Sequence, residues 1–269
     1  MTTMARASRP ATDPEQGAAE PAGGVAAVER ALLIVSAIEA SDTPSELSEI
    51  AARTDLYKST ILRLLGTLIS AGYVTRLSDG RYDLGPTSFR LGAAFSRRNA
   101  IAHRVLPALH ALVDRGTESA SFHVRQDAET RTCLFRVNSH HATLDRIEAG
   151  GSYPMKRGAA GHVILAYTGG KGPRYDEIRA TGFAVSLGER DPSCAGLAAP
   201  VFGHAGTLIG AISLSGPRER FGKSEIERMK TLLGPVAKEL TLSLGGQWPD
   251  GLRRSPLPQS KAGKRRASA

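Results

Sequence analysis

The sequence predicts an α+β protein with an N-terminal winged helix-turn-helix, a linker helix and a C-terminal antiparallel sheet domain with helices. Three observations support this prediction. Two amphipathic helices separated by a tight break lie between residues 47 and 69, a short hairpin follows them, and strand-like runs mix with helices in the second half of the chain. Strands bracketed by helices are typical of an α+β domain built on an antiparallel sheet.

The composition favours a folded protein of two domains. The chain has 269 residues, of which 41% are hydrophobic. No apolar stretch is long enough to span a bilayer, and the N-terminal segment MTTMARASRP has no apolar core, so we expect a cytoplasmic protein with no membrane contact. Cys133 and Cys194 fit a reducing compartment as free thiols.

The second of the two helices has faces of different chemistry. Its apolar residues recur at helical spacing and predict one buried side. The other side carries short polar and basic side chains that can hydrogen-bond to phosphates and base edges, and we predict that it contacts DNA. These candidate residues are Lys58, Ser59, Thr60, Arg63 and Thr67. The alternative is an ordinary packed helical hairpin.

The segment after this helix predicts a wing. Residues 73–77 and 81–84 are strand-like and flank Ser78-Asp79-Gly80, where glycine tolerates the positive φ of a hairpin turn. Arg76 and Arg81 flank the tip and are candidates for contacts with the DNA backbone or minor groove; two solvated surface arginines remain the alternative. With an amphipathic helix upstream, near residues 28–38, these elements make a winged helix-turn-helix.

The net charge of +9 does not come from this domain. Residues 25–86 hold six Lys and Arg against eight Asp and Glu, which gives −2, whereas residues 87–249 carry +7 and residues 250–269 carry +5. Affinity for DNA must therefore come from the placement of a few cations. The basic C-terminal tail has the composition of a disordered segment.

In the second half, helices are expected at about 86–96, 101–115, 161–167 and 223–243, and strands at 119–124, 132–137, 196–202 and 207–215. We expect helices on one face of the sheet and a ligand cup on the other face. The predicted organisation is a disordered tail at 1–24, a DNA-binding domain at 25–86, a linker helix at 87–100, a ligand-binding domain at 101–249 and a disordered basic tail at 250–269.

Three segments in the same order resemble the IclR family of bacterial transcriptional regulators: RYDLGPTSFRLG, YPMKRGAAGHVILAY and GLAAPVFGHAGTLIGAISLSGP. The resemblance extends from about Val25 to about Gly246. It implies a C-terminal effector-binding domain related to the GAF fold. It also implies dimers, often paired into tetramers, that bind palindromic operators and respond to small organic acids. Repression is favoured over activation.

The resemblance also implies an effector site made by the loop before the buried helix and by the closing strands. The matching positions are Gly158, Ala159, Ala160, Gly161, Gly196, Ser213 and Ser215. Amides at a helix N-terminus suit a carboxylate, and two serines at i and i+2 of a strand share one face. Alternatively, the glycines serve the turn and the serines satisfy backbone groups.

The chain departs from the family at two of these places. Some members have an acid in the loop after the short helix, where this chain has Ser186 within residues 183–186; others have a polar or thiol side chain at the position of Gly196. The pocket is therefore expected to be roomier and less acidic, for an effector larger or more apolar than a two-carbon acid. Met155, Phe122 and Phe135 are further lining candidates, although we expect each in the core.

Two other functions remain open as alternatives. A catalytic or redox site would use Cys133 or Cys194 with a histidine, and a metal sensor would use His140 and His141 with one of the same cysteines; the other histidines considered are His123 and His162. The chain has no nucleophile elbow, phosphate loop or helical His-Glu metal motif. We therefore expect no enzyme activity, no cofactor and no bound metal.

Overall fold

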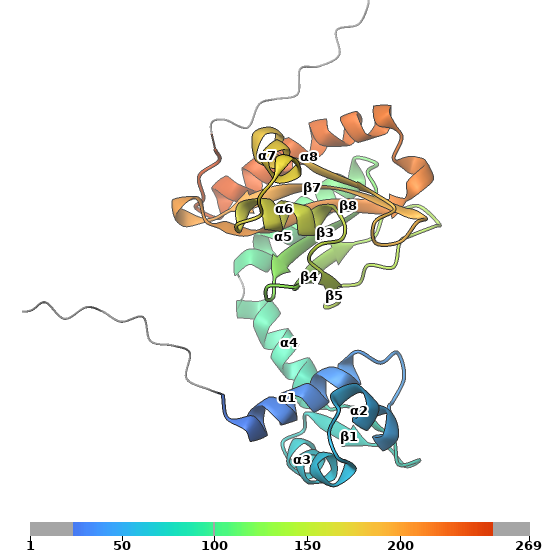
Figure 1. Ribbon diagram of the computed structural model, residues 1–269. Helices are drawn as coiled ribbons and strands as arrows, with labels where there is room; N and C mark the ends of the chain where they lie inside the picture. Colours follow the sequence, from blue (N-terminus) through green and yellow to red (C-terminus); the bar gives the residue numbers. More distant parts are fainter. Residues whose placement is uncertain (1–23, 99, 250–269) are drawn as a thin grey trace, which may run out of the picture. The chain divides into compact units, whose positions relative to one another are not determined.

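The computed structural model describes residues 24–98 and 100–249 (Figure 1). The chain divides into two compact units, with the division between Phe95 and Ser96, inside helix α4 (Pro86–Arg98). The tails predicted at 1–24 and 250–269 lie outside the described residues, apart from Gly24. Within the described ranges, no helix is both long and apolar enough to cross a membrane.

In the described part of the N-terminal unit, three helices and a two-stranded antiparallel hairpin precede α4, which confirms the winged helix-turn-helix. The elements are α1 (Ala26–Glu39), α2 (Leu47–Thr54), α3 (Lys58–Ser70), β1 (Val74–Arg76) and β2 (Tyr82–Leu84). Glu46 and Glu49 form a capping box that starts α2, and Asp55, with a left-handed φ of 54°, ends it. The core buries Ile34, Ile38, Ile50, Ile61, Leu65, Leu68, Val74 and Tyr82.

The C-terminal unit is built on a six-stranded antiparallel sheet with the order β5-β4-β3-β8-β7-β6. The strands are β3 (Ser119–Arg125), β4 (Thr130–Val137), β5 (Ser152–Pro154), β6 (Ala184–Leu187), β7 (Cys194–Phe202) and β8 (Leu208–Pro217). The helices are α5 (Ala100–Asp114), α6 (Ala159–Tyr167), α7 (Pro173–Thr181) and α8 (Lys223–Ser243). This α+β architecture confirms the predicted fold class.

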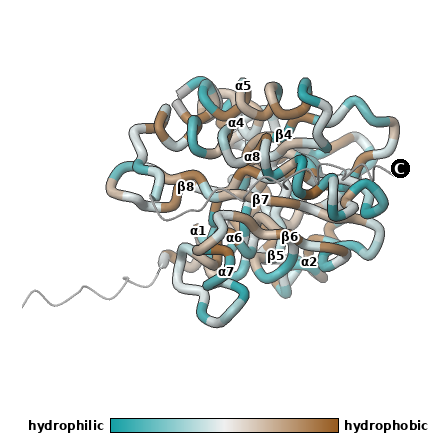
Figure 2. The backbone as a smooth tube through the Cα atoms, turned by 90° about the horizontal axis from the view of Figure 1, so that it is seen from above, coloured by the Kyte–Doolittle hydropathy of each residue, from teal (hydrophilic) through white to brown (hydrophobic). Residues whose placement is uncertain are grey.

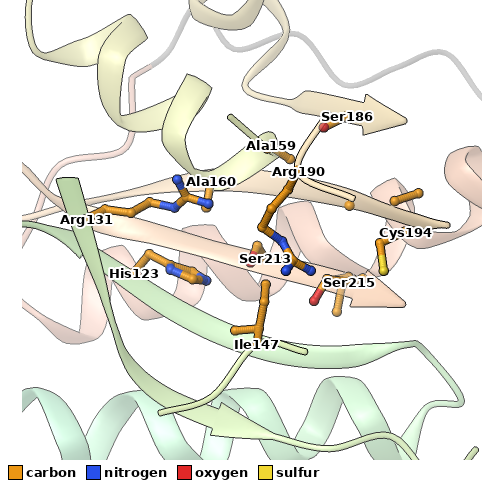
Figure 3. A pocket seen from close by; sticks show the side chains of 14 residues that line it. His123, Arg131, Ile147, Ala159, Ala160, Ser186, Arg190, Cys194, Ser213 and Ser215 are labelled. Carbon is orange, nitrogen blue, oxygen red and sulfur yellow. The ribbon is translucent and has the colours of Figure 1, made fainter. Parts of the chain in front are cut away.

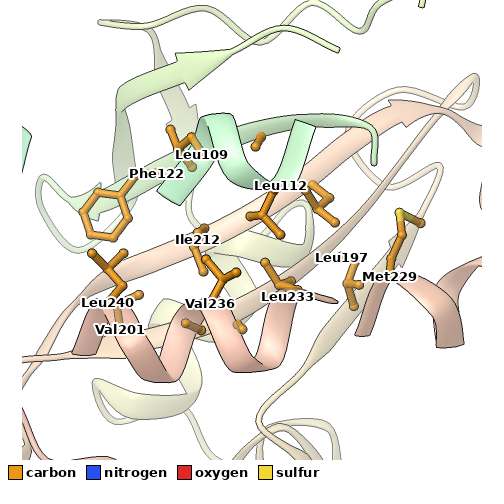
Figure 4. Packing of buried hydrophobic residues seen from close by; sticks show 14 of the residues in the cluster. Leu109, Leu112, Phe122, Leu197, Val201, Ile212, Met229, Leu233, Val236 and Leu240 are labelled. Atoms are coloured by element: carbon orange, nitrogen blue, oxygen red, sulfur yellow. The ribbon is translucent and has the colours of Figure 1, made fainter. Parts of the chain in front are cut away.

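The main hydrophobic core lies between the sheet and helices α5 and α8 (Figure 4). Alternation along the strands decides which side chains enter it, because neighbouring residues of a strand point to opposite faces. On β8, Ile212 and Leu214 join this core, whereas Ala211 packs against α6 on the other face. In Figure 2 hydrophobic segments run along β7 and β8, and hydrophilic segments mark the peripheral loops.

Several predictions for this unit need correction. Residues 183–186, which the family resemblance places in a loop after a short helix, mostly form strand β6, and the short helix before them is α7. Strand β5 was not predicted. The second face of the sheet is not free, because the small residues Ala184, Ala198 and Ala211 let α6 pack closely on it. The core was the expected place of Phe122, Phe135 and Met155, and the structure agrees: the two phenylalanines lie in the core under α5 and α8, and Met155 lies in the core under α6.

Candidate functional site

The exposed face of α3 carries the residues predicted to contact DNA. Lys58, Ser59, Arg63 and Thr67 are exposed and Thr60 is half-buried, while Ile61, Leu65 and Leu68 are buried on the opposite side. The structure therefore brings all five predicted residues to one polar surface. Contact with DNA stays a prediction.

Two residues of this surface were not predicted. Leu62 is 49% exposed, and Tyr57, immediately before the helix, is 85% exposed. Leu62 lies four residues after Lys58, so helical periodicity could have placed it on the same face. An apolar side chain there suits the methyl group of thymine. Gly66 adds to the open surface, because no atom lies within 4 Å of the place where its Cβ would be.

The two arginines of the wing have different surroundings. Arg81 forms an ion pair with Asp79 at 2.7 Å within the turn, and this hydrogen bond lowers the pKa of Asp79. Arg76 is exposed, and its guanidinium carbon lies 5.8 Å from the centroid of the Tyr82 ring. Arg76 is therefore the freer of the two to contact a phosphate.

A pocket lies in the C-terminal unit, on the face of the sheet that carries α6 (Figure 3). Its empty volume is about 380 Å³, which includes space open to solvent. The lining residues come from β3, β4, β6, β7, β8, the start of α6 and neighbouring loops. They are His123, Arg131, Ile147, Gly158, Ala159, Ala160, Ser186, Arg190, Cys194, Ala195, Gly196, Ser213, Leu214 and Ser215.

Six of the seven residues predicted for an effector line this pocket, and Gly161 does not. A Cβ on Gly161 would lie 2.1 Å from the carbonyl oxygen of Met155 and 2.9 Å from Nη1 of Arg131, so this glycine serves packing. A Cβ on Gly196 would lie 3.3 Å from the carbonyl oxygen of Leu214, in the floor of the pocket. The role of these residues in binding stays a prediction.

Ser213 belongs to a buried polar network. Ser213 Oγ lies 3.0 Å from Ser121 Oγ, which lies 3.0 Å from Nε2 of His123. Burial lowers the pKa of His123 well below its usual range, with smaller contributions from nearby arginines, so the ring is neutral. Its Nδ1 is buried without a hydrogen-bond partner among the described residues. This network leaves polar atoms in the pocket wall that a ligand can satisfy.

Arg131 lines the pocket but is not among the residues that the sequence predicts for the effector site. It lies on β4, is 2% exposed, and has no carboxylate within ion-pair distance among the described residues. One Nη1–H donates to the carbonyl of Pro154, and Nε is buried without a partner. Burial, and then repulsion from Arg190, lower the pKa of Arg131 to about 10, so it is still charged near neutral pH.

A second arginine enters the pocket from the loop between β6 and β7. Arg190 forms an ion pair at 3.1 Å with Asp145, whose other oxygen lies 2.5 Å from Arg136. Arg131 and Arg190 also share an aromatic neighbour, since their guanidinium carbons lie 5.8 and 5.9 Å from the centroid of the Tyr153 ring. The lining residues thus include two guanidinium groups and no carboxylate.

A β-bulge explains why sequence periodicity does not reveal this cluster. The pairing between β3 and β4 shifts between Phe122, which opposes Phe135, and His123, which opposes Cys133, so Leu134 is an extra residue. Arg131 and Arg136 are five positions apart and would point to opposite faces of a regular strand. The extra residue puts both on the pocket side.

Glu189 anchors the loop that carries Arg190. Its carboxylate accepts the Gly158 N–H at 3.1 Å and lies 2.6 Å from His162 Nε2 and 2.5 Å from Arg174. Burial raises the pKa of Glu189, but the hydrogen bonds from Arg174, His162 and Gly158 outweigh it and hold the pKa at about 2. The Gly158 amide is therefore already occupied, which leaves Ala159 and Ala160 of the predicted loop.

The residues considered for a metal or redox site do not assemble. Within residues 24–98 and 100–249, no group of three or more His, Cys, Asp or Glu could hold a metal ion. His140 lies 3.7 Å from Asp114 and His141 3.5 Å from Glu118. Burial raises the pKa of Cys133 to about 12, so its reactive thiolate is disfavoured.

Both units of the chain are similar to known regulators of transcription. Two family models match: the IclR helix-turn-helix domain over residues 27–78, and the bacterial transcriptional regulator IclR C-terminal domain over residues 173–242. The HTH-type transcriptional regulator BhcR of Paracoccus denitrificans is 29% identical over 252 residues, 84% of this chain and 90% of BhcR. The transcriptional repressor IclR of Escherichia coli is 25% identical and covers 87% of this chain and 95% of its own.

Solved structures show the same fold. A putative IclR regulator from Silicibacter sp. TM1040 has a TM-score of 0.72 at 23% identity and covers 85% of this chain and 100% of its own. An IclR homologue from Microbacterium hydrocarbonoxydans, in complex with 4-hydroxybenzoate, has a TM-score of 0.66 at 20% identity and covers 81% and 99%. The relatives are named as regulators or repressors of transcription. This chain belongs to the IclR family of bacterial transcriptional regulators.

Proposed function

We propose that this protein is a repressor whose affinity for operator DNA changes when a small organic acid binds in the pocket of the C-terminal unit. Lys58, Ser59, Thr60, Arg63 and Thr67 contact the major groove, and Arg76 and Arg81 the backbone beside it. Residues 25–86 form the DNA-binding domain, 87–100 the linker helix and 101–249 the effector-binding domain. As a regulator of transcription, the protein acts in the cytoplasm.

The proposal of an organic acid as effector depends on the buried position of Arg131. A buried charge that lacks a counter-ion destabilises the folded protein, and a bound carboxylate would supply two acceptors in the geometry that a guanidinium prefers. Ser213 and Ser215 add hydroxyl groups to the lining of the same pocket. The 4-hydroxybenzoate bound to the Microbacterium homologue is an acid of this kind and supports the same class of ligand.

Two further parts of the proposal have their own support. Several relatives are named repressors, which favours repression over activation. Homodimers or tetramers are favoured by apolar side chains that the chain leaves exposed on α1 and α4. Val28, Leu32, Phe89 and Phe95 are between 48% and 80% exposed, and a second copy would bury such surface.

Fluorescence anisotropy with labelled duplexes tests the proposal. We expect the full chain to bind intergenic DNA from upstream of its own gene at least ~10-fold more tightly than a scrambled duplex near physiological salt. Benzoate, 4-hydroxybenzoate or an aliphatic acid should then change that affinity. Equal, weak binding to both duplexes would contradict operator recognition.

The variant Arg131→Gln separates the pocket from the DNA surface. It should abolish the response to acids, because it removes the buried charge that attracts them. Arg125→Gln, on the same sheet but exposed and outside the pocket lining, is the matched control and should keep the response. A response that survives in Arg131→Gln would place the effector elsewhere.

A further inference from the structure

We propose that the effector is an organic dianion, a dicarboxylate whose two carboxylates bind Arg131 and Arg190 separately. This inference rests on the proposed function, because it specifies the acid that the same pocket takes. It depends on the balance of charge around the pocket and on the directions from which the two arginines enter.

The balance of buried charge favours a ligand with two negative charges. Arg131 and Arg190 line the pocket, and Arg136 lies behind them with a side chain that is 5% exposed. Asp145, with a fully buried side chain, is shared between Arg136 and Arg190. Three guanidinium groups therefore face one carboxylate, and two positive charges remain uncompensated.

The other carboxylates near the pocket do not change this balance. Glu189 pairs with Arg174 at 2.5 Å and uses its second oxygen for Gly158 and His162. Glu118 pairs with Arg220 at 2.8 Å. Each of these acids already has its own arginine, so neither can neutralise Arg131 or Arg190.

The two arginines reach the pocket from different elements and different sides. Arg131 extends from β4 beside the start of α6, whereas Arg190 descends from the β6–β7 loop toward Ser213 and Ser215 (Figure 3). If a single carboxylate bound Arg131, the only counter-ion of Arg190 would be Asp145, which Arg190 shares with Arg136. Two carboxylates on one molecule can satisfy both, with the serine hydroxyls and neutral His123 along the space between them.

A monoanion would leave one of the two excess charges uncompensated in a buried site. A charge-assisted hydrogen bond is worth enough to make the diacid bind about 10- to 100-fold more tightly than a ligand of the same shape with one neutral end. A phosphate monoester carries the same charge on one group. Arg131 and Arg190 enter the pocket from different elements and different sides, which favours two groups over one.

Calorimetric titration of the full chain with matched ligands tests this inference. Succinate is compared with succinamate, and terephthalate with 4-carbamoylbenzoate, because each pair differs only in the replacement of one carboxylate by an amide. Phenyl phosphate is the third probe. We expect at least one diacid to bind about 10-fold or more tightly than its amide and more tightly than phenyl phosphate.

Arg190→Gln should reduce the preference for the diacid over its amide to about 1, while the amide itself binds with little change. Arg125→Gln is the control and should keep the preference. Should Arg190→Gln fail to fold, Arg190→Lys retains the charge and should retain a reduced preference. A preference that is unchanged in a folded Arg190→Gln protein would overturn the assignment of the second carboxylate.

The remaining outcomes distinguish this inference from the proposed function. Equal binding of diacids and their amides would overturn the inference of a dianionic effector, whereas the proposed regulation by an organic acid would stand. If phenyl phosphate bound more tightly than every diacid, the effector would carry both negative charges on one group, and the dicarboxylate would be ruled out. Specific operator binding with no response to any acid would overturn the organic-acid effector itself, and the dicarboxylate with it.

Discussion

The recognition surface on α3 and the pocket under α6 differ in how the chain assembles them. The first comes from a single helix, Lys58–Ser70, in which the polar residues follow one another at helical spacing. The second gathers side chains from five strands, one helix start and loops that are up to about ninety residues apart, such as His123 and Ser213. Local periodicity therefore suffices for the first and not for the second.

The charges of the two regions also act differently. Lys58 and Arg63 are exposed, so water screens them and they attract phosphates without strain on the fold. Arg131 and Arg190 have lost most of this hydration, and their charges must be balanced inside the protein or by a ligand. A regulator needs both properties: a surface that stays open to DNA and a buried site that changes when it is filled.

The largest effect is expected from substitutions in the hydrophobic cores, each of which should impair one unit and leave the other folded. Leu65→Ala removes a side chain that is 1% exposed in the N-terminal unit, and we expect it to lower the free energy of unfolding of that unit by about 2–5 kcal/mol. Operator binding should fail while calorimetric binding of the acid persists, because the pocket has a core of its own.

Leu233→Ala, at a fully buried position of α8, is the reciprocal variant and should impair acid binding first. Chemical denaturation followed by calorimetry distinguishes the two. Loss of both activities in either single variant would show that the units fold as one cooperative block.

A smaller effect is expected at the DNA surface. Arg63→Ala should weaken binding to upstream DNA by about 1–3 kcal/mol and reduce the preference over scrambled DNA, if Arg63 contacts a base edge. Anisotropy measures this loss. Arg30→Ala, which removes an exposed arginine from α1, is the control for net charge. An equal loss on both duplexes would assign Arg63 to the phosphates.

Much of the fold could be predicted because its signals are local. The final helix was expected at 223–243 and is found at Lys223–Ser243, since Ile226, Met229, Leu233 and Val236 recur at helical spacing. The wing was predictable from Asp79-Gly80, where glycine adopts a φ of 90°. The family resemblance added the positions of the effector site on these loops and strands, which residue patterns alone did not assign.

The remaining features depend on contacts between distant segments. The strand was expected to begin at residue 132, which left Arg131 in the preceding turn, whereas β4 begins at Thr130. The bulge at Leu134 then reverses which residues of β4 face the pocket. Strand β6 is only four residues long, and the sequence alone places it in a loop, because its pairing with β7 and not its own pattern defines it. Glu189 gave no signal, since its partners lie fifteen to thirty-one residues upstream.

The smallest expected effect concerns this anchor. The pKa of Glu189 is about 2 in the folded protein, against 4.5 as its ordinary value, so the ionised form stabilises the fold. That stability is fully present above about pH 5 and is lost as the pH falls toward 2. Glu189→Gln should lower the free energy of unfolding by about 1–2 kcal/mol near pH 7. This is less than the pKa shift alone implies, because solvent screens a carboxylate whose side chain is 29% exposed.

His162 does not reverse this direction. Burial lowers its pKa more than the bond to Glu189 raises it, so the ring is neutral near pH 7 and Arg174 is the principal cation at the anchor. Urea denaturation from pH 7 to pH 3 should show the difference between the native protein and Glu189→Gln shrink as the pH falls. Glu177→Gln, an exposed change on α7, should show no such trend. A difference that is constant with pH would mean that Glu189 holds the Arg190 loop by packing and not by charge.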